Sequence, residues 1–398
     1  MSTAQPLAGI RIIAVEQYGA GPFGSMYLAD LGAEVIKIEN PAIGGDISRQ
    51  TGPFFLGEGD SQFFQTFNRN KKSLTLNLKE QAGREVFHKL VATADAVMNN
   101  LRGDQPAKLG LDYVSLQAVN PKIVCAHLSA YGRDNDRANW PGYDYLMQAE
   151  AGFMALTGAP EEPPARFGLS MVDFMTGVTT AAGLMAALIG ALRSGKGTDV
   201  DVSLFDVALH QLTYPATWYL NGGHVTERIE RSAHPSTVPC QTYTSADGWV
   251  FVMGMTEKFW QLIVEGINRP ELADDPRFNS VACRRENRQA LQTILDAAFA
   301  ERSTDDWVNH FAGKIPIAPV YGLDQALENP YLGEIGMLQS LPHTQNANFR
   351  VLANPIKIGG ERLPGKGCSS LGADSESLLA ELGYSSDAIA NLKQSGAI

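Results

Sequence analysis

The first forty residues alternate between apolar runs and polar breaks in a pattern that predicts a strand, a helix and a second strand. The apolar run at 10–15 suits a buried strand, and residues 25–31 have helical spacing that Gly32 would end. A second apolar strand is predicted at 34–39, and the whole unit has the length of a right-handed parallel crossover. The chain therefore opens with the building unit of a parallel sheet.

The same alternation continues to about residue 204. Further strands are predicted at 72–78, 94–98, 123–128 and 199–204, with helices between them, including a long helix at about 174–193. Strands that alternate with helices predict an α/β fold in which a Rossmann-like parallel sheet is covered by helices on both faces. Ligands bind such sheets beyond the carboxyl ends of the strands, so functional residues are expected just after each strand.

The pattern changes near residue 222. A polar stretch is followed by a predicted hairpin at 242–255 and by amphipathic helices from 257 to about 310. We predict a discontinuous large domain made of 1–220 with 330–398, and a smaller α+β domain at 225–325. The last stretch is too short to fold alone and is expected to pack back on the large domain.

Composition and charge narrow the class of protein. The 398 residues carry a net charge of −11, which disfavours binding to nucleic acid. The four cysteines are far apart and form no C-x-x-C pair, which disfavours a zinc site or a disulfide framework and fits a reducing compartment. No signal peptide is visible at 1–7, and the apolar stretch at 178–192 is predicted to be a buried helix. We therefore expect a cytoplasmic protein that binds neither nucleic acid nor membrane.

The turn after the first strand matches a dinucleotide-binding pattern. Residues 19–24 read G-x-G-x-x-G, and Glu39 lies about twenty residues further on, where such folds place an acid on the ribose. An NAD-dependent dehydrogenase is one interpretation. A basic cluster at 69–72, with Lys79 soon after, is either a solvated loop or an anion-binding loop. Both questions stay open at this point.

Asp173 is the most interesting single residue. The seven histidines are scattered without metal-ligand spacing, and no G-x-S-x-G elbow is present, so metal catalysis and a triad hydrolase are unsupported. Asp173 stands just before the predicted long helix, where it could simply be the N-cap. Alternatively, an ionised carboxylate at a helix N-terminus could point into a cleft and act as a covalent nucleophile.

A family resemblance bears on this choice. Short blocks across nearly the whole chain carry it: 6–11, 20–22, 28–39, 68–74, 141–145, Asp173 with Gly177, 195–197 with 201–203, 315–320 and 378–384. Together and in this order they resemble the class III (CaiB/BaiF-type, formyl-CoA transferase-like) CoA-transferases. Each block alone is weak, whereas the ordered set is specific.

The resemblance implies a covalent mechanism. Asp173 would attack the thioester of a donor acyl-CoA, giving a mixed anhydride and then an aspartyl-CoA thioester, which the acceptor carboxylate opens. No separate base is needed, because an aspartate with an ordinary pKa near 3.9 is ionised at neutral pH. The N–H groups of the turn at Gly19 and Ala20 are expected to stabilise the oxyanions. CoA and acyl-CoA would be substrates, and no permanently bound cofactor or metal is expected.

The resemblance also implies a set of CoA contacts. The positions that match the family's contacts are Asn40, Leu76, Asn100, Lys108 and Tyr143. Positive charge suited to the nucleotide phosphates is expected from Lys71, Lys72, Lys79 and Arg102. The chain departs from the family at Asn40, where many members have an arginine stacked on adenine, and an asparagine cannot provide that contact.

Substrates, alternatives and assembly follow from the same resemblance. The block 69–72 with 52–55 resembles the dicarboxylate-using members, with succinyl-CoA as a candidate donor. An α-methylacyl-CoA racemase is one alternative, but it needs a histidine near 140–145, and that segment has none. A non-catalytic CoA-binding protein is another, which the presence of Asp173 disfavours. The resemblance further implies an interlocked homodimer.

Overall fold

The computed structural model describes residues 5–343 and 346–398, which form two compact units. The first unit contains the described residues of Met1–Ala151, Gly168–Leu212 and Pro330–Ile398, and the second contains Gly152–Phe167 and Thr213–Asn329. Compared with the predicted domains, the structure assigns Gly152–Phe167 and the residues just after Leu212 to the smaller unit. The two units are described separately below.

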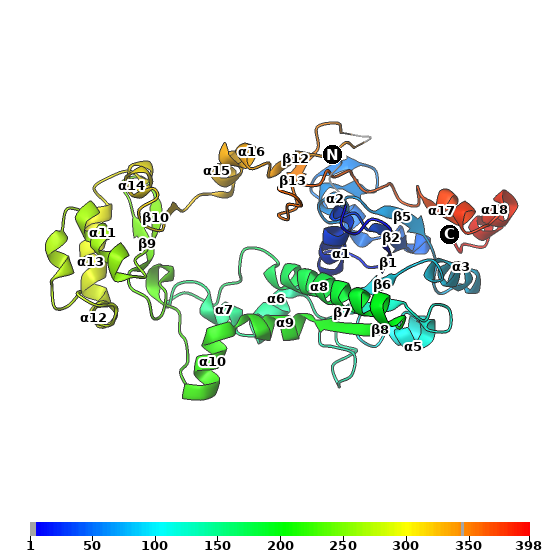
Figure 1. The fold of residues 1–398 in the computed structure, drawn as a ribbon, viewed down its shortest axis with the longest axis horizontal. Helices are drawn as coiled ribbons and strands as arrows, with labels where there is room; N and C mark the ends of the chain where they lie inside the picture. Colours follow the sequence, from blue (N-terminus) through cyan, green and yellow to red (C-terminus); the bar gives the residue numbers. More distant parts are fainter. Residues whose placement is uncertain (1–4, 344–345) are drawn as a thin grey trace. The chain divides into compact units, whose positions relative to one another are not determined.

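A six-stranded parallel sheet forms the centre of the first unit (Figure 1). Its strands are β1 (Arg11–Val15), β2 (Glu34–Glu39), β5 (Lys72–Thr75), β6 (Ala96–Asn99), β7 (Val124–Ser129) and β8 (Thr198–Ser203). They lie in the order β5-β2-β1-β6-β7-β8, and every neighbouring pair is parallel. The predicted Rossmann-like parallel sheet is confirmed. The strand order reverses between β1 and β6, which is the point where such sheets open a ligand crevice.

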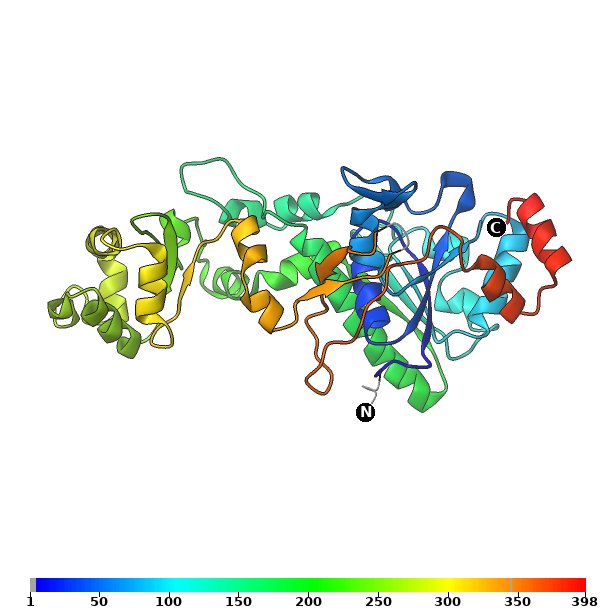
Figure 2. The same cartoon turned by 90° about the horizontal axis from the view of Figure 1, so that it is seen from above.

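Both faces of the sheet are buried at β2, β1, β6 and β7, as continuous apolar strands predict, whereas the edge strand β8 is partly exposed. Ile13, Val97 and Cys125 face one core, which α3 (Gln81–Val91), α17 (Ser375–Glu381) and α18 (Ser386–Gln394) cover. Their neighbours Ile12 and Ala126 face the other core, against α1 (Ala20–Asp30) and α8 (Met171–Ser194). Figure 2 shows the helices and the sheet from above.

Shorter elements complete the first unit. The helices are α2 (Gln62–Asn68), α4 (Pro106–Leu109), α5 (Tyr113–Leu116), α6 (Asp144–Glu150), α9 (Leu204–Gln211) and α16 (Tyr331–Glu334), with 3-10 turns at Pro41–Ile43 and Ile47–Gln50. Two small antiparallel pairs are β3 (Phe55–Gly57) with β4 (Asp60–Ser61), and β12 (Leu338–Ser340) with β13 (Arg350–Leu352).

Helices α1 and α8 approach each other most closely at two glycines, Gly24 and Gly177. A Cβ atom on Gly24 would lie 2.3 Å from the carbonyl oxygen of Gly177, and one on Gly177 would lie 2.5 Å from the carbonyl oxygen of Ala20. Real side chains do not tolerate such distances, so only glycine allows the backbones to approach this closely. The crossing brings the first turn of α8, with Asp173, beside the turn that begins α1.

Helix α8 is long and apolar, with 24 residues. By length and composition alone it could cross a membrane, but core helices of soluble proteins often meet the same criterion. One face of α8 packs on α1 and the sheet through residues such as Leu184 and Leu188. The opposite face leaves Val178, Ile189 and Leu192 exposed. The predicted buried helix is therefore buried along one face only.

The C-terminal residues return to the first unit. The Asp374 carboxylate accepts the Ser73 N–H at 2.8 Å, and the Ser375 hydroxyl accepts the Thr75 N–H at 3.1 Å. These bonds satisfy the outer edge of β5, and Leu378 and Leu379 enter the core behind it. The expected packing of the tail on the large unit is what the structure has.

The second unit combines a small antiparallel sheet with helices. Strands β9 (Cys240–Thr244), β10 (Trp249–Met253) and β11 (Ile317–Pro319) lie in the order β11-β10-β9, and β9 with β10 forms the predicted hairpin. The helices are α7 (Phe153–Leu156), α10 (Thr213–Gly222), α11 (Glu257–Gly266), α12 (Val281–Glu286), α13 (Arg288–Phe299), α14 (Thr304–Phe311) and α15 (Leu323–Glu328). Trp260, Phe299 and Trp307 are in its core.

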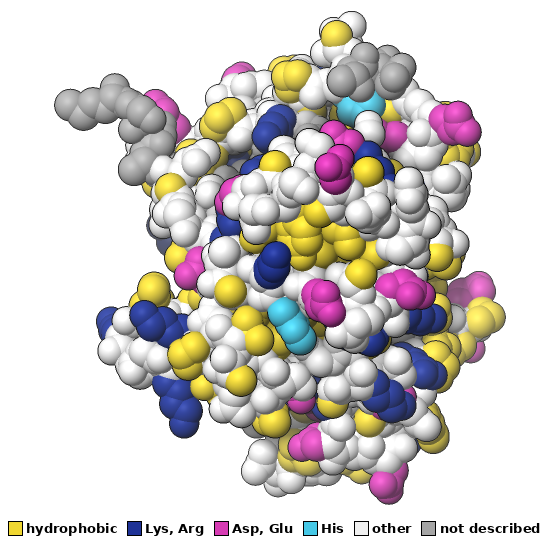
Figure 3. All heavy atoms as spheres, turned by 90° about the vertical axis from the view of Figure 1, so that its right-hand side faces the viewer, with side chains coloured by type: hydrophobic (Ala, Val, Ile, Leu, Met, Phe, Trp, Pro, Cys, Tyr) yellow, Lys and Arg dark blue, Asp and Glu magenta, His cyan; other side chains and the backbone are white. Residues whose placement is uncertain are grey.

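Charges of both signs are mixed on the side of the molecule shown in Figure 3. Lys and Arg side chains are interspersed there with Asp and Glu, around an apolar area near the centre of the view. This face carries no continuous basic field, which is in keeping with the acidic balance of the chain.

Candidate active site

A cavity of about 420 Å³ opens at the carboxyl edge of the sheet, beside the point where the strand order reverses. Its walls come from the turn after β1, from the loops after β6 and β7, from the segment before α6, and from the first turn of α8. Of the residues predicted to bind or react, six line it: Gly19, Ala20, Asn100, Arg102, Tyr143 and Asp173. The structure thus brings together residues that are spread over more than one hundred and fifty positions of sequence.

Asp173 is the third residue of α8, and Ser170 occupies the N-cap position. The N-cap interpretation of Asp173 is therefore wrong. Its carboxylate lies against the turn after β1, because a Cβ atom on Gly19 would be 3.2 Å from Asp173 Oδ2. A side chain at residue 19 would crowd the carboxylate, so the glycine keeps space open next to it.

A second carboxylate, Asp144, lies beneath Asp173. Asp144 is 3% exposed; its Oδ2 accepts the backbone N–H of Asp173 at 3.0 Å, and its Oδ1 accepts Gln148 Nε2 at 2.6 Å. Burial, together with the charge of Asp144, raises the pKa of Asp173 to about 7. The expectation that Asp173 has an ordinary pKa near 3.9 is therefore wrong.

The turn after β1, which lies next to this carboxylate, carries N–H groups at the start of helix α1. Gly19 is the N-cap of α1 and has no side chain to cap the helix. Within residues 5–343 and 346–398, the N–H groups of Gly19, Ala20 and Gly21 have no hydrogen-bond acceptor. Free N–H groups at the start of an eleven-residue helix favour negative charge. They are the type of group that stabilises an oxyanion.

A narrower cavity of about 270 Å³ adjoins the first one, and both are lined by Gln17 and Leu101. Asn40, Leu76 and Lys79, three more of the predicted contact residues, line it. Its other walls are mostly apolar and include Ile38, Ile43, Leu78 and Leu109. The Asn40 side chain accepts the N–H of Ala42 and so starts a 3-10 turn at the rim. An apolar slot next to a polar cavity can hold a flat ring system at one end of a long ligand.

Two predicted cations near these cavities share one acid. Lys108 is paired with Asp104 at 2.6 Å, and Arg102 lies 3.5 Å from the same carboxylate. Arg102 lines the larger cavity, whereas Lys108 lines neither, although its neighbour Leu109 lines the narrower one. Lys108 is exposed, so its predicted role would require the ligand to extend along α4.

Part of the predicted basic cluster is buried. Arg69 forms an ion pair with Asp30, and Lys71 forms one with Glu16, with every side chain at most 6% exposed. Lys72 is partly exposed and pairs with Glu34. The expectation that Lys71 supplies charge to phosphates is wrong, because its ammonium is enclosed by Glu16, Asn68 and the carbonyl of Pro22. Lys79 remains an exposed cation at the narrower cavity.

The remaining candidates for other chemistries are used structurally. Glu39 lines the narrower cavity, but it is 2% exposed and its carboxylate accepts hydrogen bonds from Arg49 and Ser73, so it is already paired within the protein. His127 is buried in β7 between Asn99 and Asp199. In the described part of the chain, no group of three or more His, Cys, Asp or Glu side chains is placed to hold a metal ion.

Comparisons with known proteins identify the family of this chain. A family model described as CoA-transferase family III matches residues 7–375. The chain belongs to CoA-transferase family III. It is 32% identical to a succinyl-CoA:glutarate CoA-transferase of Mus musculus, over 99% of this chain and 90% of the relative. It is also 32% identical to a succinate–glutarate CoA-transferase of Agrobacterium fabrum, over 95% of this chain and 96% of the relative.

A solved structure of the same family has the same fold. A CaiB/BaiF family protein from Brucella suis superposes with a TM-score of 0.82 at 31% identity, covering 95% of this chain and 99% of that one. As a family III CoA-transferase, this enzyme uses CoA thioesters as substrates. The dehydrogenase interpretation of the G-x-G-x-x-G turn is therefore wrong.

Sequence reasoning missed Asp144 as a functional neighbour of Asp173. Asp144 stands inside the block 141–145 that supported the resemblance, but the two carboxylates are 29 residues apart along the chain. The block was the only available signal, because neither helical nor strand periodicity relates the two positions.

Proposed function

We propose that this enzyme moves CoA from an acyl-CoA donor to a carboxylic acid acceptor, with a dicarboxylate as acceptor and succinyl-CoA as donor. Two relatives that match nearly the whole chain carry succinyl-CoA or succinate and glutarate in their names, which supports dicarboxylate substrates. The observation that carries the chemistry is the Asp173 carboxylate, which lines a cavity beside free N–H groups of the turn after β1.

The two adjoining cavities suggest how CoA would lie. The nucleoside end would enter the apolar slot lined by Leu76 and Asn40, with Lys79 near its phosphates. The flexible arm of CoA that carries the sulfur would pass Gln17 and Leu101, the residues shared by both cavities, and would place the thioester beside Asp173. Asn100, Arg102 and Tyr143 would contact this second part.

The chemistry would proceed by nucleophilic catalysis on Asp173. An oxygen of Asp173 attacks the thioester carbonyl carbon, the C–S bond breaks, and an acyl-aspartyl anhydride and CoA thiolate form. The thiolate then attacks the aspartyl carbonyl, which releases the donor carboxylate and leaves an aspartyl-CoA thioester. The acceptor carboxylate attacks the aspartyl carbonyl of this thioester, which frees the CoA thiolate and forms a second anhydride. The thiolate then attacks the acceptor's acyl carbon in that anhydride, which restores Asp173 and releases the new acyl-CoA.

Each of these attacks places negative charge on a carbonyl oxygen. The N–H groups of Gly19 and Ala20 are the donors proposed to receive that charge, since they have no acceptor among the described residues. A pKa near 7 suits Asp173 for the role, because the carboxylate is more nucleophilic than an ordinary one and is still available at neutral pH.

The assembly and the location are also proposals. An interlocked homodimer follows from the family resemblance, and exposed apolar side chains on the outer face of α8, such as Ile189 and Leu192, provide surface that a second copy could cover. A cytoplasmic location rests on the cysteine spacing, which fits a reducing compartment.

The test is a transfer assay with succinyl-CoA or acetyl-CoA as donor and a panel of monocarboxylates and dicarboxylates as acceptors. We expect transfer to dicarboxylates by the wild-type enzyme and none by Asp173→Asn, which should still bind CoA. Incorporation of solvent deuterium at the acyl α-carbon without transfer would instead favour a racemase. CoA binding that is equal in both variants, with neither reaction, would favour a non-catalytic CoA-binding protein.

A further inference from the structure

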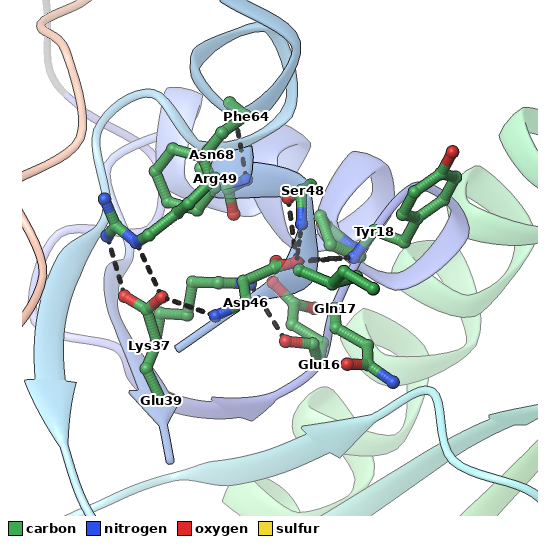
Figure 4. A network of polar contacts seen from close by, with 12 residues as sticks. Glu16, Gln17, Tyr18, Lys37, Glu39, Asp46, Ser48, Arg49, Phe64 and Asn68 are labelled. Carbon is green, nitrogen blue, oxygen red and sulfur yellow. Dashed lines mark hydrogen bonds and ion pairs between the residues drawn. The ribbon is translucent and has the colours of Figure 1, made fainter. Parts of the chain in front are cut away.

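Six buried charged residues lie directly under the turn after β1. This buried charge network consists of Glu16, Lys37, Glu39, Asp46, Arg49 and Lys71, each at most 5% exposed. It contains three acids and three bases. Ion pairs join Lys37 to Asp46 and Arg49 to Glu39 (Figure 4), and a third ion pair joins Lys71 to Glu16. Buried ion pairs add little net stability, since desolvation offsets their attraction. Stability alone therefore does not explain why these six charged residues are buried here.

The network fastens the backbone of the turn. Lys37 Nζ donates to the carbonyl oxygen of Glu16 at 2.9 Å and pairs with Asp46 Oδ2 at 2.8 Å. The Asp46 carboxylate accepts the N–H of Tyr18, at 3.1 Å to Oδ1 and 3.3 Å to Oδ2 (Figure 4). From the loop after β6, Asn100 accepts the N–H of Gln17 at 2.9 Å and donates to its carbonyl oxygen at 2.7 Å. Backbone groups of three consecutive residues are thus held by side chains.

The residue held by Asp46 has an unfavourable backbone conformation. Tyr18 has φ of +69°, in the left-handed region that aromatic residues rarely adopt. Such a conformation is strained and persists only where the surroundings impose it. The next residue is Gly19, whose missing side chain leaves space for the Asp173 carboxylate. The conformation of Tyr18 therefore sets the direction in which the following N–H groups point.

We propose that Asp46 and Lys37 are positioning residues, which hold Tyr18 in its left-handed conformation and thereby aim the N–H groups of Gly19 and Ala20 at the carbonyl that reacts with Asp173. This inference rests on the proposed function. A carboxylate suits the role because a charged acceptor binds an N–H more strongly than a neutral one. Burial works against the charge of Asp46, but the ion pair with Lys37 and the hydrogen bonds from Ser48 hold its pKa below the usual range.

Asp46 also lines the narrower cavity, so the experiment must separate positioning from CoA binding. We expect Asp46→Ala to lower kcat about 100-fold, the loss that a displaced catalytic group typically causes. The Kd for CoA, measured by direct titration, should change less than about threefold. An unchanged kcat, or a loss confined to the Kd, would overturn the proposal.

Tyr18→Gly supplies a readout that a purely structural role would not move. Glycine adopts positive φ without steric cost, so the turn in that variant should no longer depend on Asp46. We expect Asp46→Ala to lower kcat less than about fivefold in the Tyr18→Gly background, against about 100-fold in the wild type. Equal losses in both backgrounds would contradict the role assigned to Tyr18.

Asp30→Ala is the matched control. Asp30 is buried, pairs with Arg69 and also accepts hydrogen bonds from Asn70 and Asn354, but it ends α1, about 15 Å from the turn that begins it. The Asp30→Ala variant should lose stability as Asp46→Ala does, but its kcat should stay within about threefold of the wild-type value. An equal loss of kcat in both variants would mean that lost stability alone explains the effect.

Should Asp46→Ala fail to fold, the pair Lys37→Met with Asp46→Leu replaces the ion pair by apolar side chains of similar size, a change that buried pairs often tolerate. A folded double variant with unchanged kcat would overturn the proposal, and a folded one with about 100-fold lower kcat would support it. Transfer by the wild-type enzyme is measured in parallel, so a failure of the proposed function is distinguished from a failure of the positioning role.

Discussion

Replacing Asp173 with asparagine should make the protein more stable at alkaline pH while it removes catalysis. The carboxylate is buried next to Asp144, and this raises its pKa to about 7, whereas in the unfolded chain it would have an ordinary value near 3.8. The folded protein must therefore hold an ionised group in an unfavourable place. Asparagine has nearly the same shape without the charge, so the cost disappears.

The magnitude follows from the pKa values. The folded and unfolded pKa values differ by about three units, and each pKa unit corresponds to 1.36 kcal/mol. The gain in the free energy of unfolding from Asp173→Asn therefore has an upper limit of roughly 4 kcal/mol at pH 8. Between about pH 4 and pH 7 the folded state keeps a proton that the unfolded state has lost, so the free energy of unfolding of the wild type falls as pH rises. The difference between the two proteins should thus be near zero at pH 4 and largest above pH 7.

Urea unfolding at a series of pH values tests this expectation. Asp206→Asn is the matched control, because Asp206 is also the third residue of a helix, α9, but is exposed. The control should be slightly less stable than wild type, since a carboxylate favours a helix N-terminus. If Asp173→Asn were no more stable than wild type at pH 8, the burial and charge repulsion assigned to Asp173 would be refuted.

Three further perturbations follow from the structure. Gly177→Ala, which places a Cβ 2.5 Å from a carbonyl oxygen of α1, should lower the free energy of unfolding by about 1–3 kcal/mol. Gly190→Ala on the same helix meets no atom within 4 Å and should be neutral or stabilising. Equal effects of the two substitutions in urea unfolding would contradict the close approach of α1 and α8 at their glycines. The pH profile of kcat/KM should rise through about pH 7 as Asp173 ionises, and Asp144→Asn should shift that rise to lower pH; an unshifted profile would remove Asp144 as a cause. Ile189→Glu, on the exposed face of α8, should lower the fraction of the proposed dimer that light scattering finds after refolding, because interlocked chains can pair only while they fold; full recovery of a dimer would exclude this face from the interface.

The sheet could be predicted because its signals are local. Apolar runs alternate with helical spacing along the first two hundred residues, and the structure places Ile12 and Ile13 in separate cores on the two faces, as a doubly covered parallel sheet requires. The spacing of the turn at 19–24 also pointed to an edge of the sheet where the structure has a cavity. The same spacing could not identify the ligand, because a tight turn before a helix suits several anions and oxyanions.

The electrostatics could not be predicted, because they depend on residues far apart in the chain. Lys71 was expected to bind phosphate, but in the folded chain its ammonium pairs with Glu16, which is 55 positions away. Asp173 was expected to have an ordinary pKa, which the fold raises by burying the carboxylate and by placing it next to Asp144. Neither pairing has a periodicity that a sequence could reveal. The block order along the chain located Asp173, whereas its ionisation is a property of the three-dimensional site.

The most direct test is whether Asp173 becomes covalently modified during turnover. The wild-type enzyme, incubated with acyl-CoA and hydroxylamine, should convert the Asp173 carboxyl to a hydroxamate, because hydroxylamine attacks the activated aspartyl carbonyl and releases CoA. Peptide mass spectrometry should find this change at Asp173 only when acyl-CoA is present, and not at Asp206. Active transfer with an unmodified Asp173, or with modification at another carboxylate, would contradict the covalent role assigned to it.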